Sequence, residues 1–296
     1  MTGLRKLLLA MPGKLLSSFA GRGIGDLPLI MWFQSFFYHH LKPSGIVMIN
    51  VEGSQMYVDS RDTGVAPFLL EWGVYEKYVT TLYKKLVRKG TVVVDVGANI
   101  GYYTLLAARL TGEKGKVFAF EPDPHNYGLL CKNIELNGYR NVIAVRKAVF
   151  SKSGRMPLFL DKKNLGAHSL SAENVEKADS IMIDAISLDD YFKEINSKID
   201  IVKMDVQGSE MAVLDGMANT ITQNGNLEII TEFWPTGLRN AHVSPRGFLE
   251  NLADYGFAIY QIDRTIDPVD IDQLLHMRSE KEPATLLCKK RRTIYS

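Results

Sequence analysis

Short apolar segments alternate with amphipathic ones along the chain from about residue 90 onward. Seven of the apolar segments are typical of buried strands, because branched and aromatic residues fill each run and polar or glycine positions bound it. Between most of them, apolar residues recur at helical spacing. This alternation predicts an α/β fold, a doubly wound and mostly parallel seven-stranded sheet with helices on both faces. The predicted strands are 91–98, 116–123, 141–150, 199–206, 226–234, 257–263 and 284–290.

Local signals predict where several helices begin and end. Asp123 is expected to cap a helix that begins at Pro124, since proline is tolerated in a first helical turn. Ser244 is expected to cap a second helix in the same way. A third helix is predicted over residues 71–90, with Gly90 as its end.

Two parts of the chain depart from the alternation. Residues 151–198 are polar at first and then apolar, and we expect an insertion that contains a hairpin over the edge of the sheet. Residues 1–70 are expected to form an N-terminal extension, made of a helical arm and a short hairpin that turns at Gly53–Ser54. The predicted division is therefore an extension over 1–70 and a main domain over 71–296.

Composition and charge narrow the class of protein. The chain has 296 residues, 46% of them hydrophobic, and a formal net charge of +2, so no strong field directs it to nucleic acid or anionic lipid. Cys131 and Cys288 share no metal-ligand spacing, and we interpret them as reduced thiols of a cytoplasmic protein.

The N-terminal arm leaves the question of membrane contact open. No run of about 18 apolar residues is present, so a membrane-spanning helix is not predicted. Apolar residues within 1–25 do repeat at helical spacing beside basic ones, which allows peripheral membrane contact. Packing of the arm on the protein's own body, or on a second subunit of a homo-oligomer, is the favoured interpretation.

The first predicted strand runs directly into a glycine-containing loop, within the segment "VVVDVGANIGYYT". Glycines at such a place indicate that the backbone approaches a ligand closely. A phosphate-binding loop would need a lysine that is absent here, and a dinucleotide fingerprint would need a glycine between Gly97 and Gly101, where Asn99 stands instead. Both phosphate-binding interpretations therefore fail.

The acidic residues of this region favour a cationic ligand without phosphate. Asp95 ends the first strand, and S-adenosylmethionine carries an ammonium and a sulfonium group. Glu121 ends the second strand, 20 residues after Gly101, where a carboxylate can accept hydrogen bonds from both ribose hydroxyls. The sequence thus predicts an S-adenosylmethionine site; the alternative is that the glycines only permit a tight turn.

Five segments, "VVVDVGANIGYYTLLAA", "VFAFEPDP", "NIELNG", "SLDDYF" and "IVKMDVQGSE", resemble successive motifs of the FkbM-type family of methyltransferases. The resemblance covers roughly residues 72–263. It implies a Rossmann-like class I fold, S-adenosylmethionine as cofactor and, for most members, methylation of an oxygen. The cofactor-binding residues that we expect on this basis are Asp95, Gly97, Ala98, Asn99, Gly101, Glu121 and Pro122.

One position departs from the family pattern. The motif after the fourth strand usually reads Asp, apolar, Glu, Gly, any residue, Glu, and here Gln207 replaces the first glutamate while Asp205, Gly208 and Glu210 are in place. If that carboxylate were an essential base, this protein would be impaired. If it were only a polar contact, glutamine would serve.

Catalytic candidates come from the strand ends and from two loops. Asp205 and Glu232 end the fourth and fifth strands, where they could bind Mg²⁺ or act as a general base. The alternative is that Asp205 caps the next helix and Glu232 binds a neighbouring side chain. Glu210 and His168 complete the predicted catalytic set, and His242 is a second loop histidine in a lid position.

The acceptor is predicted mainly from missing motifs. The fourth strand is followed by "DVQG" instead of the motif that methylates base amines, and neither cysteine lies near the predicted site. The lack of a basic, aromatic-rich appendage also argues against nucleic acid. We expect a small-molecule, glycan or lipid-linked acceptor with a hydroxyl on a sugar, glycolipid or polyketide. An RNA methyltransferase and a non-catalytic cofactor-binding module stay open as alternatives.

Overall fold

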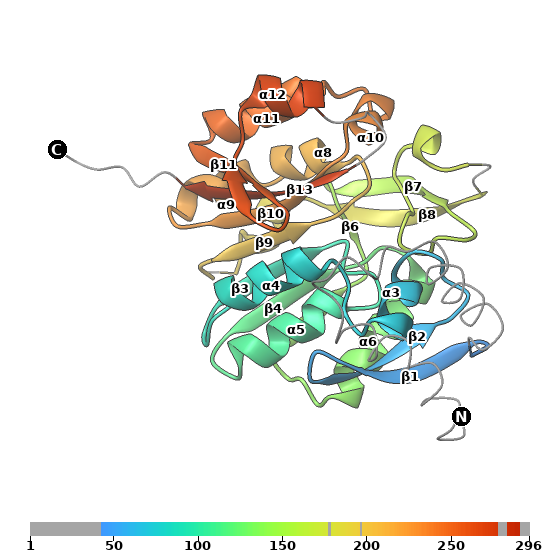
Figure 1. The fold of residues 1–296 in the computed structure, drawn as a ribbon. Coiled ribbons are helices and arrows are strands. Elements are labelled where there is room, and N and C mark those ends of the chain that lie inside the picture. Colours follow the sequence, from blue (N-terminus) through green and yellow to red (C-terminus); the bar gives the residue numbers. More distant parts are fainter. Residues whose placement is uncertain (1–42, 177–178, 196, 278–282, 291–296) are drawn as a thin grey trace, which may run out of the picture.

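The central sheet of this computed structural model, which describes residues 43–176, 179–195, 197–277 and 283–290, has eight strands in the order β12-β11-β13-β10-β9-β3-β4-β5 (Figure 1). The neighbouring strands β10, β9, β3, β4 and β5 run parallel to one another. Strand β13 lies between β10 and β11 and is antiparallel to both. The strand bounds are β3 (Val92–Val96), β4 (Lys116–Phe120), β5 (Val142–Val145), β9 (Ile201–Met204), β10 (Glu228–Phe233), β11 (Phe257–Ile262), β12 (Ile266–Pro268) and β13 (Ala284–Lys290).

All seven predicted strands take part in this sheet, which confirms the doubly wound α/β fold. The additional strand, β12, has only three residues, all exposed, and pairs with β11 at the edge. The apolar pattern could not reveal it because no side chain of β12 is buried.

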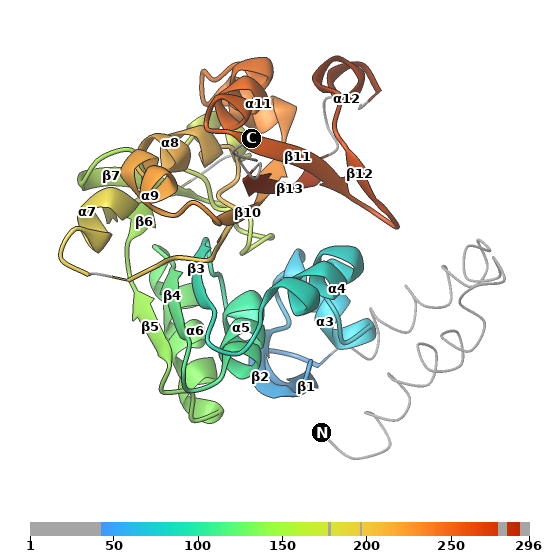
Figure 2. The ribbon, with the colours of Figure 1, turned by 90° about the vertical axis from the view of Figure 1, so that its left-hand side faces the viewer.

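Helices cover both faces of the sheet (Figure 2). Successive strand residues point to opposite faces, so that Val93 packs with one layer of helices and Val94 with the other. The first layer holds α4 (Lys77–Leu86), α5 (Tyr102–Thr111) and α6 (Pro124–Leu136). The second layer holds α7 (Leu188–Phe192), α8 (Glu210–Asp215), α9 (Ala218–Gln223) and α11 (Pro245–Asp254). The remaining helices are α3 (Val65–Glu71), α10 (Pro235–Asn240), α12 (Ile271–Met277) and the short 3-10 helix η2 (Ala172–Asn174).

Both predicted helix caps are confirmed. The Asp123 carboxylate accepts a hydrogen bond from the backbone N–H of Asn126 at 2.8 Å, and α6 begins at Pro124. The Ser244 hydroxyl accepts one from the backbone N–H of Gly247 at 3.2 Å, and it caps α11.

The helix predicted over 71–90 is wrong in its extent. Residues 72–76 interrupt it, so that α3 ends before them and α4 begins after them. Gly73 and Glu76 have φ values of 68° and 43°, a left-handed conformation that a right-handed helix cannot contain. Helix α4 ends at Leu86, before Gly90, because Val87 is already extended.

The strand predicted over 141–150 is also divided. After β5 the chain leaves the central sheet, and β6 (Ala148–Val149) joins a second sheet of order β6-β8-β7. In that sheet β7 (Gly154–Leu160) and β8 (Asp179–Ile186) form an antiparallel hairpin within the segment 151–198. The two basic residues between β5 and β6 are the only sign of this division in the sequence.

A two-stranded hairpin, β1 (Ile46–Val51) and β2 (Ser54–Asp59), packs against α6 near the edge of the fold. The Asn133 side-chain oxygen accepts a hydrogen bond from the backbone N–H of Tyr57 at 2.6 Å, and Asn137 does the same for Gln55 at 2.8 Å. Two asparagines of the "NIELNG" motif therefore hold the hairpin to the main domain.

Some expectations concern residues outside those described. The helical arm lies outside them, and so does the membrane contact expected through residues 1–25. The division of the chain at residue 70 stays a prediction, as does the formation of a homo-oligomer. Within the described ranges, no helix combines the length and the apolar character needed to cross a bilayer.

Candidate functional site

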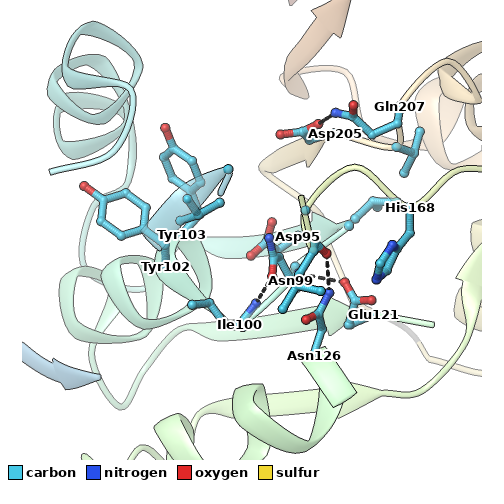
Figure 3. A pocket seen from close by; sticks show the side chains of 18 of the residues that line it. Asp95, Asn99, Ile100, Tyr102, Tyr103, Glu121, Asn126, His168, Asp205 and Gln207 are labelled. Atoms are coloured by element: carbon cyan, nitrogen blue, oxygen red, sulfur yellow. Dashed lines mark hydrogen bonds between the residues drawn. The ribbon is translucent and has the colours of Figure 1, made fainter. Parts of the chain in front are cut away.

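A cavity of about 450 Å³ opens at the carboxyl ends of β3, β4, β9 and β10 (Figure 3). The strand order reverses between β3 and β9, and open α/β sheets bind their ligands at such a point. Each strand places one carboxylate in the lining: Asp95, Glu121, Asp205 and Glu232. The cavity volume lies within the range of roughly 300–1,000 Å³ that is usual for small-molecule sites.

Six of the seven predicted cofactor-binding residues line this cavity, and Gly101 does not. The six are Asp95, Gly97, Ala98, Asn99, Glu121 and Pro122. Gly101 instead begins α5 with a φ of 97°, and a Cβ there would lie 2.7 Å from Cδ1 of Leu130 on α6. Its role in the structure is close packing of two helices.

Gly97 is required by a contact between two loops. Its φ is 78°, and a Cβ at this position would lie 2.1 Å from the backbone oxygen of Asp205. The expectation that this glycine brings the backbone close to a ligand stays a prediction, and the nearest protein group to the missing side chain belongs to the loop after β9. The loops after β3 and β9 are thereby held together at the base of the cavity.

Glu121 is held in position by the backbone of both neighbouring loops. One carboxylate oxygen accepts from the N–H of Asn99 at 2.8 Å and the other from the N–H of Asp123 at 2.9 Å. Burial raises the pKa of Glu121 to about 8, against the opposing effect of these two N–H groups. Each oxygen retains a lone pair for a ligand donor.

Asp95 lies deeper, where it also supports α5. Its carboxylate accepts a hydrogen bond of 2.6 Å from the Thr104 hydroxyl, in the first turn of that helix. Burial raises its pKa, and the Lys203 ammonium group opposes this increase. Asp95 therefore has a structural role in addition to its place in the lining.

Lys203, which sequence reasoning missed, lies among these acids with 5% of its surface exposed. Its Nζ atom is 3.5 Å from a carboxylate oxygen of Asp205 and 4.5 Å from the centre of the Tyr103 ring. Burial alone would lower its pKa, but Asp205, Glu76 and Asp95 raise it, so the ammonium form persists. A lysine inside the otherwise apolar strand "IVKM" was the available signal, because burying an ammonium group without partners is costly.

Glu76 was missed as well. It accepts a hydrogen bond of 2.8 Å from the Tyr103 hydroxyl, and burial raises its pKa while Lys203 lowers it. No local pattern marked this residue, since it lies in the interruption between α3 and α4.

Gln207 connects the two acids that were predicted to face the substrate. Its Nε2 atom donates to Asp205 at 2.7 Å and to Glu232 at 3.2 Å. Burial, with Asp205 and Glu210 nearby, raises the pKa of Glu232 well above its ordinary value. Asp205 does not cap the next helix, whose N-cap is Ser209.

The structure does not bring Glu210 to the cavity. The side chain is fully buried, and its Oε1 atom accepts from the backbone N–H groups of Val206 and Gly208 at 3.2 and 3.3 Å. Burial raises its pKa to about 7. Glu210 therefore holds the loop that carries Gln207 and does not reach a substrate.

His168 lines the cavity, but its hydrogen bonding disfavours a role as base. Its Nδ1 atom accepts from the backbone N–H of Asp161 at 3.0 Å, so the neutral ring carries its proton on Nε2. Burial lowers its pKa, and the acids that oppose this effect are Asp123, Asp161 and Asp62, none of which lines the cavity. His242 is not among the lining residues.

The predicted Mg²⁺ site gains no support. Within the part of the chain that the structure describes, no group of three or more His, Cys, Asp or Glu residues could hold a metal ion. Asp205 and Glu232 instead accept hydrogen bonds from the Gln207 amide, and the Lys203 ammonium group supplies positive charge close to Asp205.

Aromatic side chains form another wall of the cavity. Tyr75 makes edge contacts with Phe68 and Tyr102, with ring centres 5.8 and 6.0 Å apart. With Tyr103, these residues line the cavity and provide apolar faces for a ring-shaped ligand.

Comparison with known proteins gives a consistent result. The family model described as "Methyltransferase FkbM domain" matches residues 95–259. The chain is 28% identical over 193 residues to methyltransferase sdnD of Sordaria araneosa, a match that covers 53% of this chain and 73% of that protein. It is 32% identical over 161 residues to hexuronic acid methyltransferase AglP of Haloferax volcanii, with coverage of 52% and 61%. A solved rRNA methylase from Streptococcus thermophilus, 10% identical, matches over 72% of this chain and 93% of that one with a TM-score of 0.44.

Proposed function

This chain belongs to the FkbM family of methyltransferases, and from that premise we propose that it transfers the methyl group of S-adenosylmethionine to a hydroxyl oxygen of a small polar acceptor. A sugar, glycolipid or polyketide would provide such a group. The observation that carries the proposal is the pair Asp205 and Glu232, joined by one amide and lining the same cavity as Glu121.

The residues of the cavity suit this cofactor. When bound, S-adenosylmethionine supplies a methyl group on a positively charged sulfur atom. The described lining residues hold four carboxyl groups and one ammonium group, so the lining offers acceptor oxygens to the donors of a cationic ligand. Glu121 would accept from the ribose hydroxyls. Asn126 also lines the cavity, and its Oδ1 atom is buried without a hydrogen-bond partner, which suits a nucleoside that carries several donors.

The two acids on the acceptor side would act differently. A carboxylate oxygen of Asp205 would accept the proton of the acceptor hydroxyl as its oxygen takes the methyl group, and the nearby Lys203 ammonium group would stabilise the carboxylate. The electron pair of the broken carbon–sulfur bond would stay on sulfur, and S-adenosylhomocysteine would leave. The raised pKa of Glu232 favours its protonated form, which would donate to a second oxygen of the acceptor and orient it. Such orientation, with exclusion of water, is the main contribution that methyl transfer requires from the protein.

Replacement of Asp205 tests the proposal. We expect the native chain to transfer label from S-adenosylmethionine to at least one member of a panel of glycosides, glycolipids and polyketides. Asp205→Asn should lower kcat/KM by about 100-fold or more, because the proton acceptor is lost. Binding of S-adenosylhomocysteine, measured by calorimetry, should change little.

Asp254→Asn, at an exposed position of α11, is the matched control and should leave the transfer rate unchanged. Failure of the native chain to bind S-adenosylhomocysteine would end the proposal. If the native chain methylated RNA in a parallel assay and methylated no member of the panel, RNA would replace the hydroxyl-bearing small molecule as the proposed acceptor.

The pKa of Glu121 leads to a separate prediction about pH. Ribose hydroxyls donate to the ionised carboxylate, so binding should release a proton below the pKa of about 8. Affinity for S-adenosylhomocysteine should therefore rise by up to about tenfold per pH unit as pH increases from about 6, and should level off above about 8. Calorimetry at several pH values measures this slope. In Glu121→Gln the slope should become flatter and binding weaker; an unchanged slope would assign the proton to another group.

A further inference from the structure

Gln207 is held by contacts on its backbone. It has a φ of 51°, and its carbonyl oxygen accepts hydrogen bonds from the Ser169 hydroxyl and the Asn174 amide, both at 2.9 Å. The next residue, Gly208, has a φ of 96°, and a Cβ there would lie 2.5 Å from the Asn174 amide nitrogen. The segment 169–174, Gly237 of α10 and the buried Glu210 together fix this turn, so the position of the Gln207 Cα atom is well defined.

The chemistry of an amide suits the place where that side chain ends. Nε2 carries two hydrogens and can only donate, and it lies 2.7 Å from Asp205 and 3.2 Å from Glu232. Each hydrogen therefore has one carboxyl oxygen to bind. An ionised glutamate in the same place could only accept, and it would repel both acids.

The charge balance of the site depends on the same residue. Lys203 is surrounded by Asp205, Glu76 and Asp95, with Glu232 also close enough to be affected by it. With glutamate at position 207, as in the usual family motif, another negative charge would join this group without a further cation among the described lining residues. The neutral amide of Gln207 adds no negative charge to this group.

We propose that Gln207 is a positioning residue that assigns different roles to Asp205 and Glu232, and that it lets Lys203 alone balance the acidic cluster without a divalent cation. The roles of the two acids rest on the proposed function, whereas the charge balance does not. Gln207 is thus a functional part of this site and not a sign of lost activity.

The test compares Gln207→Glu with Gln223→Glu, which makes the same charge change at an exposed position of α9. Calorimetry with Mn²⁺ as the probe should detect no binding to the native chain or to Gln223→Glu, and binding to Gln207→Glu. The thermal stability of Gln207→Glu relative to native should fall as pH rises from about 5 to 8, because the added carboxyl group must ionise next to two others. Gln223→Glu should show no such dependence.

Two further measurements separate positioning from a purely structural effect. In Gln207→Glu, the limb of the pH profile for methyl transfer that reports Glu232 should move to higher pH by about one unit, because the added carboxylate raises the pKa of that acid further. Gln207→Asn keeps the charge but shortens the side chain, so it should lower kcat without creating Mn²⁺ binding.

Mn²⁺ binding by the native chain that Asp205→Asn abolishes would overturn the inference. Identical pH dependence of stability in the two glutamate variants would overturn it as well. If the native chain fails to bind S-adenosylhomocysteine, the proposed function fails, and the Mn²⁺ and stability measurements still decide the charge balance.

Discussion

Gly97→Ala is expected to lower the free energy of unfolding by about 3 to 5 kcal/mol, the largest effect of a single methyl group that we foresee. The new Cβ would lie 2.1 Å from the backbone oxygen of Asp205, and the φ of 78° would be strained for alanine. Backbone cannot move aside cheaply here, because Asp205 donates its own N–H to the backbone oxygen of Val96 at 3.1 Å. Urea unfolding followed by circular dichroism measures the change.

Gly138→Ala provides the matched control. Gly138 has a similar φ of 64°, but no atom lies within 4 Å of the position of its missing Cβ. This variant should cost only the conformational strain, about 1 to 2 kcal/mol. Equal destabilisation by the two substitutions would show that the contact between the loops after β3 and β9 is not what requires Gly97.

Lys203→Met is expected to destabilise the fold by about 3 to 5 kcal/mol near pH 8, because it removes the cation from a buried group of acids. The pKa values of Glu76, Asp95 and Glu232 are raised in the folded state, and Lys203 lowers all three. Without it these pKa values rise further. In the variant, these acids are protonated at low pH, so no carboxylate charge is buried without a cation. At high pH they must ionise in the apolar interior.

The sign of the pH dependence follows from this. The loss in Lys203→Met should be greatest near pH 8 and should diminish as pH falls toward about 5, since a raised carboxyl pKa favours the folded state at low pH. Lys198→Met is the control: its ion pair with Asp200 is largely exposed, and it should contribute less than about 1 kcal/mol. Urea unfolding at several pH values measures both variants, and a loss in Lys203→Met that is independent of pH would indicate lost packing instead.

Most of the sheet could be predicted, and so could half of the site. Strands β3, β4, β9 and β10 are rich in apolar residues, and Asp123 and Ser244 cap helices through bonds to the third residue after them. The loop from Asp95 to Gly101 was recognised as a site because its residues are neighbours in the chain. The errors, at residues 72–76 and 146–147, fall where the chain changes direction; Gly73 lies in the first of these segments, and the second has neither glycine nor proline.

The acceptor side was harder to predict because its residues meet only across the fold. Glu76 and Lys203 come from different segments, and their charges become costly or favourable only when folding removes both from water. Gln207 reaches Glu232 only because the loop after β9 and the end of β10 meet in the fold.

Periodicity, caps and turn residues operate over a few positions, so the chain alone was enough to establish the strands, their helices and the cofactor loop. Three features depend on distances between loops that only packing creates. They are the raised pKa of Glu232, the need for glycine at position 97 and the contacts of the Gln207 side chain. Electrostatic and steric energies change steeply over a few ångströms, and for this reason those features belong to the folded molecule.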